Sequence, residues 1–427
     1  MFVYVISKNG QPLMPTSRFG KVRRLLNANL AKVIRHCPFT IQLNYEPETE
    51  VVQEVILEQD TGSKRIGTAC IGNSKVLYQS QVELRDDIKS KMDGRRRARR
   101  FRRNRKTRYR KARFLNRRNS TKLDRLPPSI KSKVNSHIKE LNFCYTILPV
   151  VKEVLEVAQF DTRLLQNPTL ANEKVKYWGY QKGKLYGFDN AKAYVLTRDN
   201  YTCQCCKTKK GTLHVHHKIY RSQGGSDDIE NLITLCEDCH KKLHRGELKE
   251  FESKLLGKKK TNLRYATQMS VVRSQLLKNR PKAIATFGYV TKANRQNLGL
   301  EKTHHIDACV IANKGRQFEQ NDVVYFKKCI SRQDRQLTKG IRGEKIIPTS
   351  KIRGFRKFDK VKYLGQEYFI KGRRSAGTCS LMDIFGKPVD FSHMPKGWKT
   401  PKLGNCQRIQ ARTSILTERR SAIPVLS

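Results

Sequence analysis

The sequence predicts a multidomain α/β protein with a metal-binding module inserted near its middle. Short runs rich in β-branched residues alternate with helical segments, and 427 residues are enough for two or three domains with separate cores. An arginine-rich segment and a cluster of cysteines and histidines interrupt this alternation. Together these three observations indicate an α/β core that carries two insertions.

The N-terminal residues predict a small unit of their own. A short apolar strand (VYVIS) precedes a turn at Pro12–Pro15, which reads Pro-Leu-Met-Pro. A basic helix (SRFGKVRRLLNANLAKVI) and a strand (FTIQLNY) complete this unit at residues 1–50. Residues 51–84 then predict three strands, VVQEVILEQD, RIGTACIG and VLYQSQVEL, because β-branched residues fill the runs between glycine-containing breaks.

The most biased segment runs from Arg95 to Arg118. It contains 15 Lys and Arg, 13 of them Arg, with aromatic residues interleaved and no Pro or Gly. Arginine has a high helix propensity, and its planar guanidinium suits bidentate phosphate contacts and base stacking. We therefore expect a nucleic-acid-binding helix rather than a disordered basic tail. The arginines expected to make its contacts are Arg95, Arg96, Arg97, Arg99, Arg100, Arg102, Arg103, Arg105, Arg108, Arg110 and Arg113.

The rest of the chain continues the alternation. We expect a helix (IKSKVNSHIKELNFCYTIL) and a strand (EVLEVAQF), then a linker through residues 161–186 and the Cys/His module. A helix (YATQMSVVRSQLLK), a strand (AIATFGYVT) and a helix containing THHIDACVIANK follow. From about residue 320 onward the short strands VVYFKKCIS, KVKYLGQEYFIKG and CSLMDIFG predict a small basic β-barrel or sandwich.

The net charge restricts the class of partner. The chain has 88 Lys and Arg against 37 Asp and Glu, a net charge of +51, and such an excess repels itself unless a polyanion neutralises it. Nucleic acid is the natural polyanion, and no membrane anchor or lipidation motif is evident. No apolar run approaches the roughly 20 residues that span a bilayer, and the start lacks a signal-peptide pattern. We therefore expect a cytoplasmic protein with no membrane partner.

Two Cys-x-x-Cys knuckles, Cys203–Cys206 and Cys236–Cys239, have the spacing of a zinc site with four thiolate ligands. Four cysteines fill the coordination shell, so we expect the role of this zinc to be structural. Cys205 is a nearby thiol and leaves open which pair of the first knuckle binds. The other cysteines are interpreted as ordinary thiols: Cys37, Cys70, Cys144, Cys309, Cys329, Cys379 and Cys406.

A cluster of histidines surrounds the second knuckle. His216 and His217 end a short strand (TLHVHH), and the i, i+4 spacing of His240 and His244 puts both on one helix face. We expect His216, His240 and His244 to bind one divalent cation. His217 points the other way on the strand and is the expected general base for phosphodiester hydrolysis. The alternative is a zinc ribbon whose histidines pack or bind extra zinc, and His214 is interpreted as structural.

Three acids lie far apart on apolar elements. Asp60 ends an expected strand, Glu156 lies in VLEVAQF, and Asp307 lies in HHIDACVIA. A carboxylate on an apolar strand is costly without a partner, and each acid alone is weak evidence for a site. Three clustered carboxylates would repel one another unless two Mg²⁺ ions lay among them, as in sites for in-line phosphoryl displacement.

The order of His216-His217, Asn231 and the helix histidines resembles the HNH endonucleases. The three acids in their chain order resemble the RuvC/RNase H-like nucleases, split here by the HNH module. With the Pro-Leu-Met-Pro turn and the arginine-rich segment, the whole chain is similar to the IscB family of transposon-associated RNA-guided nucleases. This resemblance covers residues 1–315 in motif order, and beyond them it depends on position and basicity.

The resemblance implies roles for individual residues. Asp60, Glu156, Asp307 and His304 would form the RuvC site, with the three acids as Mg²⁺ ligands. His217 would be the HNH base, and Asn231 would brace the loop between strand and helix. One departure is visible at the first acid. The family pattern Gly-Ile-Asp-Pro-Gly is replaced by Glu-Gln-Asp-Thr-Gly at residues 58–62, so the Asp and the Gly are kept and the polar pair before them is expected to alter metal affinity.

The resemblance also implies an order of domains. These are a PLMP domain (1–50), RuvC-I (51–90), an Arg-rich bridge helix (91–120), RuvC-II (121–165), a linker (166–186), the HNH nuclease with its four-cysteine zinc site (187–250), RuvC-III (251–318) and a C-terminal β-rich domain facing the RNA and the target-adjacent motif (319–427).

The function implied by the resemblance is RNA-guided cleavage of DNA. A structured non-coding guide RNA (omega RNA) would bind one protein chain and pair with a double-stranded DNA target in a prokaryotic cell. The HNH site would cut the paired strand with one Mg²⁺, and the RuvC site the displaced strand with two, Mn²⁺ being able to substitute. Two alternatives remain: a protein-guided HNH enzyme of the homing or restriction type, and a non-catalytic zinc-ribbon RNA-binding protein.

Overall fold

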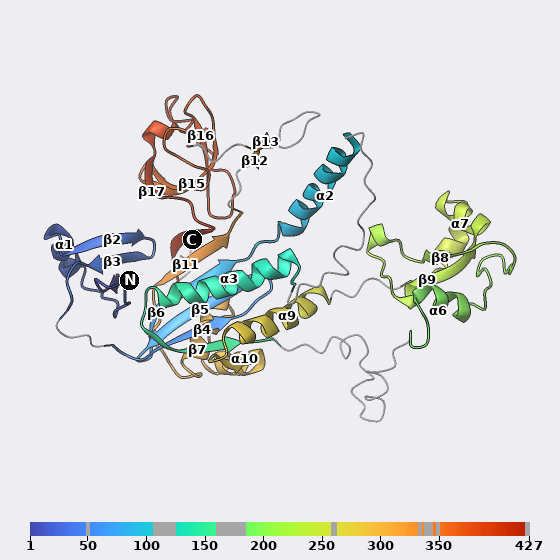
Figure 1. Cartoon of the computed structure of the whole chain (residues 1–427), viewed down its shortest axis with the longest axis horizontal. Helices are drawn as coiled ribbons and strands as arrows, with labels where there is room; N and C mark the ends of the chain where they lie inside the picture. The colour runs from blue at the N-terminus through green and yellow to red at the C-terminus, as the bar shows by residue number, and fades with distance from the viewer. Residues whose placement is uncertain are drawn as a thin grey trace. The chain divides into compact units, whose positions relative to one another are not determined.

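The computed structural model describes residues 1–47, 52–105, 125–158, 185–257, 263–331, 335–336, 345–346 and 351–422. The chain forms two compact units, of which unit 1 combines Met1–Gln159 with Gln268–Ser427 and unit 2 is Phe160–Thr267. Unit 2 is therefore an insertion in the chain of unit 1 (Figure 1). Within the described ranges, no helix combines the length and the apolar composition needed to cross a membrane.

A three-stranded sheet with strand order β1-β3-β2 forms the N-terminal part of unit 1. Its elements are β1 (Tyr4–Ile6), α1 (Phe19–Asn27), β2 (Ala31–His36) and β3 (Phe39–Leu43). The helix predicted for SRFGKVRRLLNANLAKVI is wrong at its C-terminal end, because AKVI belongs to β2. Asn29 adopts a φ of 55°, a left-handed conformation that ends a helix, and the backbone after it pairs antiparallel with β3.

A seven-stranded sheet with the order β10-β7-β4-β5-β6-β11-β18 forms the core of unit 1. Its strands are β4 (Val55–Asp60), β5 (Arg65–Gly72), β6 (Lys75–Glu83), β7 (Val150–Glu156), β10 (Ile284–Thr286), β11 (Val323–Cys329) and β18 (Ile415–Ser421). The first three form an antiparallel meander, which confirms the three strands predicted within residues 51–84. On one side β7 and β10 continue parallel to β4, and on the other β11 runs parallel to β6.

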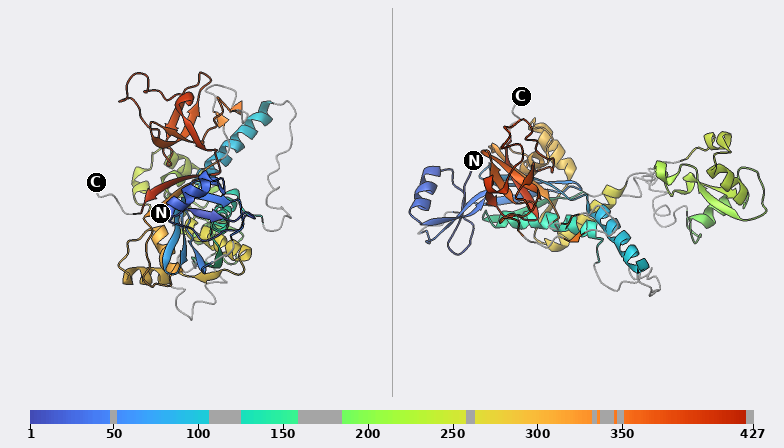
Figure 2. Two further views of the ribbon diagram at one scale, coloured as in Figure 1. Left: turned by 90° about the vertical axis from the view of Figure 1, so that its left-hand side faces the viewer. Right: turned by 90° about the horizontal axis from the view of Figure 1, so that it is seen from above.

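Helices cover both faces of this sheet. On one face lie α3 (Pro128–Tyr145) and α9 (Arg264–Asn279), whose apolar side chains join Leu57, Cys70 and Leu155 in the main core (Figures 1 and 2). On the other face α11 (His304–Ala312) packs through small residues against Ala69 and Ile71. Successive strand residues alternate between these faces, so each strand carries side chains to both layers.

A buried ion pair joins α3 to the sheet. Lys327 Nζ on β11 lies 2.8 Å from Glu140 Oε1, and both side chains are almost completely buried. The same carboxylate accepts hydrogen bonds from the hydroxyls of Tyr78 and Ser80 on β6. Because every partner of Glu140 donates to its carboxylate, the buried charge is stabilised by hydrogen bonds. These donors come from β11 and from β6, so the carboxylate favours the pairing of these two strands.

Residues 319–427 were predicted to form one separate β domain, but the structure divides them between two sheets. The strands β11 and β18 lie within residues 319–427 but belong to the core sheet. The separate part is a four-stranded antiparallel sheet with its own apolar core, in the order β16-β15-β14-β17. Its elements are β14 (Lys360–Tyr363), β15 (Gln366–Arg373), β16 (Cys379–Met382), the 3₁₀ turn η4 (Leu403–Asn405) and β17 (Gln407–Gln410), and a short ribbon joins β12 (Arg335–Gln336) to β13 (Lys345–Ile346).

A second correction concerns the strand predicted for AIATFGYVT. Strand β10 ends at Thr286, and the residues that follow begin a helix, α10 (Gly288–Asn297), for which no helix was predicted. The basic helix α2 (Ile88–Arg105) begins before the predicted arginine-rich segment. The predicted linker, up to residue 184, lies outside the described residues, as does the arginine-rich segment beyond Arg105.

Unit 2 is a small α/β body. A two-stranded antiparallel ribbon pairs β8 with β9, and α7 packs against it. Its elements are α6 (Ala191–Arg198), β8 (Leu213–His217), the 3₁₀ turns η2 (Arg221–Gln223) and η3 (Ile229–Asn231), β9 (Leu232–Cys236), α7 (Glu237–His244) and α8 (Lys249–Ser253).

Candidate active sites

Unit 2 holds a cluster of four cysteines. The Sγ atoms of Cys203, Cys206, Cys236 and Cys239 all lie within 4.8 Å of one another, and Cys205 lies outside this group. Burial raises the pKa of the Cys203 thiol, but hydrogen bonds from the backbone amides of Cys206, Cys236 and Cys205 outweigh it and lower the pKa to about 7. A lowered thiol pKa favours the thiolate, which is the form that binds zinc. Burial raises the pKa of Cys236 and Cys239, so it is the spacing of the four sulfur atoms that fits a tetrahedral zinc ion.

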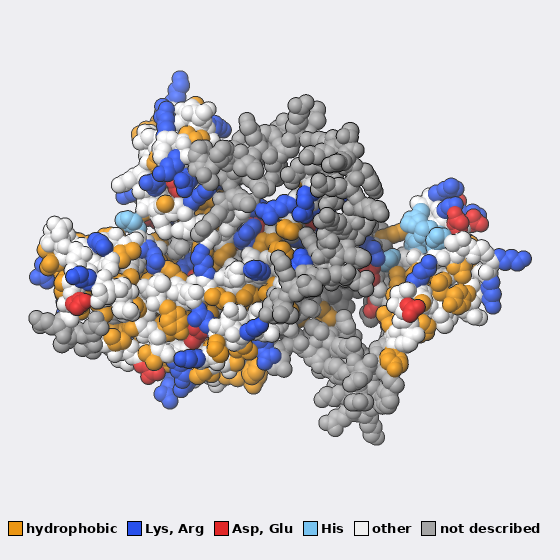
Figure 3. All heavy atoms as spheres, in the orientation of Figure 1, with side chains coloured by type: hydrophobic (Ala, Val, Ile, Leu, Met, Phe, Trp, Pro, Cys, Tyr) orange, Lys and Arg blue, Asp and Glu red, His pale blue; other side chains and the backbone are white. Residues whose placement is uncertain are grey.

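Three histidines form a second cluster in the same unit. His216 lies at the end of β8, His240 and His244 lie on α7, and one ring nitrogen of each lies within 4.8 Å of the others. Figure 3 shows the histidine side chains of unit 2 gathered on one face. His216 Nδ1 is buried without a hydrogen-bond partner among the described residues. Burial, with His240 and His244 beside it, lowers the pKa of His216 to about 4, so its ring is neutral and able to bind a divalent metal.

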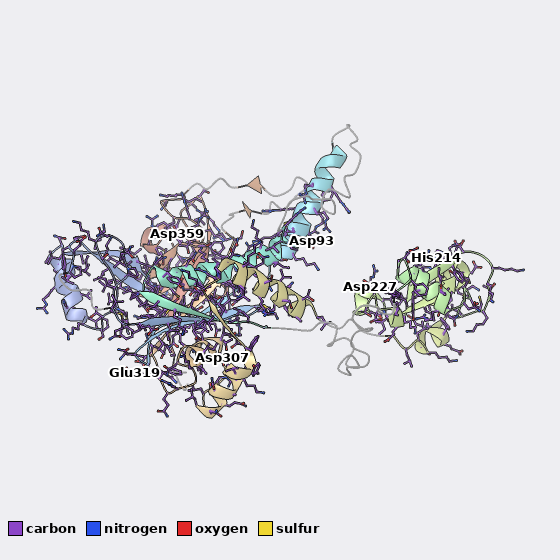
Figure 4. The ribbon with its side chains drawn as sticks, turned by 60° about the horizontal axis from the view of Figure 1, so that its bottom comes forward. Asp93, His214, Asp227, Asp307, Glu319 and Asp359 are labelled. Carbon is purple, nitrogen blue, oxygen red and sulfur yellow. The ribbon has the colours of Figure 1, made fainter. Side chains whose placement is uncertain are left out.

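His217 follows His216 on the strand and faces a different set of residues. Its Nε2 lies 2.9 Å from Asp227 Oδ1, and Arg221 Nε donates to the same oxygen over 2.8 Å. Hydrogen bonds from His217 and then Arg221 lower the pKa of Asp227. The sequence analysis did not single out Asp227, although it lies just after the Gly-Gly pair of the loop between β8 and β9 (Figure 4).

Asn231 holds the loop that joins β8 to β9. Its side chain is completely buried, and its Oδ1 accepts from the amide of Ile219 over 3.0 Å. Its Nδ2 donates to the carbonyls of Ile219 and Ser226. Gly225 is required nearby, since a Cβ there would lie 1.8 Å from the carbonyl oxygen of Ile219. These bonds fix the path of the chain between His217 and α7.

A second candidate site lies in unit 1, at the C-terminal ends of two parallel strands. Asp60 on β4 and Glu156 on β7 are register partners, so their carboxylates leave adjacent strand ends. Helix α11 brings the third acid, and its first residue, His304, places Nδ1 2.6 Å from Asp60 Oδ2. The helix approaches the sheet this closely because Gly67 on β5 has no side chain: a Cβ there would lie 1.7 Å from the carbonyl oxygen of His304.

The electrostatics of this site favour a cation among its acids. Burial, with Asp60 beside it, raises the pKa of Glu156 to about 7. Burial and Asp60 also raise the pKa of Asp307, whose Oδ1 lies 2.8 Å from Arg295 Nε without the geometry of a hydrogen bond. Carboxylate oxygens are the ligands Mg²⁺ prefers, but among the described residues only the cysteine and histidine clusters of unit 2 bring three or more ligand atoms within 4.8 Å of one another. The three acids therefore lie near one another without forming a closed ligand set, and Asp307 is paired with Arg295.

Two residues of this site were missed by the sequence analysis because their helix was missed. Thr291 and Arg295 lie on α10, and Thr291 Oγ1 donates to Glu156 Oε2 over 2.5 Å. Arg295 pairs with Asp307. The glycine at position 288 was the signal in the sequence that could have indicated a close approach here. In the structure a Cβ at this position would lie 2.8 Å from Glu156 Oε1.

Glu58 and Gln59, at which the sequence departs from the family pattern, lie on opposite faces of the sheet. Gln59 Nε2 donates to the carbonyl of His137 on α3. Glu58 lies on the face of Asp60 and lines a cavity of about 320 Å³ between β4, β7, α10 and α11. Burial, and Glu156 beside it, raise the pKa of Glu58 well above its usual range, so this carboxyl is held neutral.

The arginines of α2 are the candidate nucleic-acid surface. Residues Arg95–Arg100 form an exposed run on this helix, and its sequence goes on to Arg102, Arg103 and Arg105. Arg108, Arg110 and Arg113 lie outside the described residues. A row of guanidinium groups on one helix is a sequence-independent binding surface for phosphates.

Two protein-family models match parts of this chain. The model of the RRXRR protein family matches residues 3–183, and that of the HNH endonuclease family matches residues 203–246. The pattern in the first name occurs as Arg-Arg-Ala-Arg-Arg at residues 96–100 of α2. The chain is an IscB-like nuclease. Its HNH domain makes it an endonuclease, and the four-cysteine cluster falls within the HNH match.

Individual proteins resemble parts of this IscB-like nuclease. Anaredoxin of Nostoc sp. is 42% identical over 64 residues, which are 15% of this chain and 84% of Anaredoxin. The type IV methyl-directed restriction enzyme EcoKMcrA of Escherichia coli is 29% identical over 99 residues, 21% of this chain and 35% of that enzyme. The chain therefore spans most of Anaredoxin and about a third of EcoKMcrA.

Solved structures of Streptococcus thermophilus Cas9 also match part of the fold. The complex with the GGAA PAM is 14% identical with a TM-score of 0.34, and the match covers 58% of this chain and 32% of Cas9. The complex with the AGAA PAM is 13% identical with a TM-score of 0.32, covering 57% and 32%.

Proposed function

We propose that this chain is an RNA-guided DNA endonuclease with two nuclease sites, one for each DNA strand. The observation that carries the proposal is the position of unit 2. The histidine cluster lies in a unit inserted between Glu156 on β7 and Asp307 on α11. One chain thus carries two chemically different sites for phosphodiester hydrolysis, and neither shares residues with the other.

We assign the core of unit 1 to the RuvC/RNase H-like class. An antiparallel meander followed by two strands parallel to its first member supports this assignment. So does the position of Asp60 and Glu156 at the carboxyl ends of those parallel strands, where α/β sheets bind ligands. We propose that the segments expected as RuvC-I, RuvC-II and RuvC-III supply β4 to β7, β10 and α11 of this core, while β11 and β18 come from residues 319–427.

In the HNH site His217 acts as the general base. Donation from Nε2 to Asp227 leaves Nδ1 as the acceptor for a proton from the attacking water. His216, His240 and His244 would hold one divalent cation, which when bound supplies charge stabilisation for the phosphate and the leaving oxygen. Asn231 keeps the loop between base and helix in place, and the four-cysteine cluster would hold a structural zinc ion.

In the RuvC-type site Asp60, Glu156 and Asp307 would hold two Mg²⁺ ions, which when bound activate the nucleophile and stabilise the leaving group. His304 is oriented by its hydrogen bond to Asp60, which also raises the pKa of His304. The imidazole of His304 lies beside Asp60, where it can bind the phosphate to be cut. Thr291 fixes one oxygen of Glu156 and so limits the orientations available to that carboxylate.

The proposed partners are a guide RNA and a double-stranded DNA target. A net charge of +51 and the exposed arginines of α2 support an RNA bound in a 1:1 complex with one protein chain. In such a complex base pairing selects the sequence and the protein recognises the shape of the heteroduplex. We propose that the complex works in the prokaryotic cytoplasm, on DNA of the nucleoid.

Strand-resolved cleavage tests this proposal. The chain is expressed with its native locus, the copurifying RNA is sequenced, and a matching duplex is labelled on each strand. His217→Ala should abolish cutting of the paired strand and leave the displaced strand's cut intact, and Asp60→Ala should do the reverse. Loss of both cuts in a folded single variant would refute the two-site proposal.

The likeness to a restriction enzyme favours one alternative, a protein-guided HNH endonuclease. The arginines of α2 would then contact duplex DNA directly. RNA that stays bound at high salt, and cutting that stops after ribonuclease treatment, would decide against this alternative.

A further inference from the structure

We propose that Tyr289, backed by Phe287, is a stacking platform for one nucleobase of the strand cut at the carboxylate site of unit 1. The inference rests on the function proposed for that site. Tyr289 is 73% exposed, which is unusual for so large an aromatic side chain. Its ring lies parallel to that of Phe287, with centroids 5.9 Å apart and an interplanar angle of 8°.

Phe287 makes this platform rigid. Its side chain is partly buried and packs against the main core of unit 1, beneath α3 and α9. One face of Tyr289 is therefore held by a fixed ring, and an exposed aromatic held in this way loses little conformational entropy when a base stacks on it.

The platform lies beside the acids. Thr286, the residue before Phe287, is the register partner of Glu156. Gly288 lies between the two aromatic residues, so close to Glu156 that a Cβ there would be 2.8 Å from Oε1. Thr291, two residues after Tyr289, donates to the other oxygen of Glu156. The first turn of α10, which carries Tyr289, therefore lies beside a proposed metal ligand, while Tyr289 itself projects from another face of the helix than Thr291.

The charge near the platform suits a nucleotide. Lys292 is exposed one helical turn after Tyr289, on the same face of α10. Helix α10 contains no acidic residue. An aromatic face for a base and an ammonium group for a phosphate are the two parts of a single-strand binding site. Such a contact would fix the position of the scissile phosphate relative to Glu156.

Strand-resolved cleavage by the full chain with its copurified RNA tests the platform. Tyr289→Ala should slow cutting of the displaced strand by roughly 5- to 150-fold, mainly through KM, because loss of one stacked base has effects of this order. Tyr289→Phe keeps the ring and should stay close to the wild type. Cutting of the paired strand in unit 2 should not change. Tyr186→Ala, which removes an exposed tyrosine of unit 2, is the matched control.

An abasic substrate separates stacking from a structural effect. A single abasic nucleotide is moved along the displaced strand near its cut. One position should slow the wild type, and the same position should have no further effect on Tyr289→Ala. Equal slowing of both proteins at every position, or a Tyr289→Phe variant as slow as Tyr289→Ala, would overturn the proposal.

A binding measurement tests the platform without any cleavage. The full Asp60→Ala chain is titrated with a single-stranded oligonucleotide that contains 2-aminopurine, whose fluorescence is quenched on stacking. Quenching should be lost in Tyr289→Ala and kept in Tyr289→Phe, and quenching that persists without the ring would contradict the platform. If the wild type leaves the displaced strand uncut, the proposed function fails while this measurement still decides the platform.

Discussion

Gly67→Ala should disable the carboxylate site of unit 1 without unfolding the protein. Gly67 lies on β5 where the first turn of α11 crosses the sheet. That turn carries His304, and the third acid, Asp307, follows within the same helix. The substitution adds one methyl group, and it changes no charge and no proposed metal ligand.

The structure gives the size of the effect. The added Cβ would lie 1.7 Å from the carbonyl oxygen of His304, and Cβ atoms essentially never approach within 3.0 Å of such an atom. Helix and strand must therefore separate by more than about 1 Å, which takes His304 Nδ1 beyond hydrogen-bond distance of Asp60, now 2.6 Å away. A displacement of about 1 Å in catalytic groups costs on the order of 100-fold in rate.

The assay is strand-resolved nicking, with paired-strand cutting by unit 2 as the internal standard. Gly72→Ala is the matched control, because it makes the same change at the other end of β5. There the tightest contact of the Cβ would be with Leu77 Cδ1 at 3.1 Å, the end of a side chain that can move, and Glu54 O and Val55 Cγ2 would lie at an ordinary contact distance of 3.6 Å. A Gly67→Ala protein that cuts the displaced strand within threefold of the wild type would refute the reasoning.

Three further predictions concern the rest of the molecule. Cys236→Ser should remove bound zinc, measured by elemental analysis, and abolish paired-strand cutting while the displaced strand is still cut; unchanged zinc content would contradict this. Lys327→Met should destabilise unit 1 by about 3–5 kcal/mol, because it leaves the Glu140 carboxylate buried and unpaired. Adding Glu140→Gln to this variant should restore part of the lost stability. Hydrogen exchange in α3 and β11 measures both effects. Burial lowers the pKa of His137 to about 4, below its unfolded value of about 6.5. Its contribution to stability is therefore present above about pH 6.5 and is lost as the pH falls towards 4, by up to about 3 kcal/mol. His137→Gln should lose less stability than the wild type over this range in thermal unfolding, and equal losses would exclude the role of this histidine.

Some of the site could be predicted because its chemistry depends on local spacing. Two Cys-x-x-Cys knuckles, a strand ending in His216-His217 and a helix with an i, i+4 pair of histidines each constrain geometry over a few residues. The structure accordingly brings the same four cysteines and the same three histidines into two compact groups. The strands within residues 51–84 were predictable for a similar reason, since each is a β-branched run between turns.

Other features could not be predicted because they depend on contacts distant in sequence. Helix α10 is polar and short, and Gly288 at its start resembles a break in a strand; only its packing beside Glu156 explains the glycine. Strands β11 and β18 have the local pattern of the C-terminal segment, yet they pair with the core sheet. The helix predicted at α1 extended too far because AKVI has no local signal against helix, while pairing with β3 selects the strand.

The sequence by itself determined the residue types of the cysteine and histidine clusters in unit 2 and the three strands within residues 51–84. It named Asp60, Glu156, His304 and Asp307 only through a family resemblance, since these residues are up to 247 positions apart and share no local pattern. The tertiary structure decided how they are placed: parallel pairing aligns Asp60 with Glu156, and the absence of a side chain at Gly67 lets α11 bring His304 against Asp60. The physical reason is that spacing along the chain limits geometry only within an element, whereas the distance between elements is set by packing.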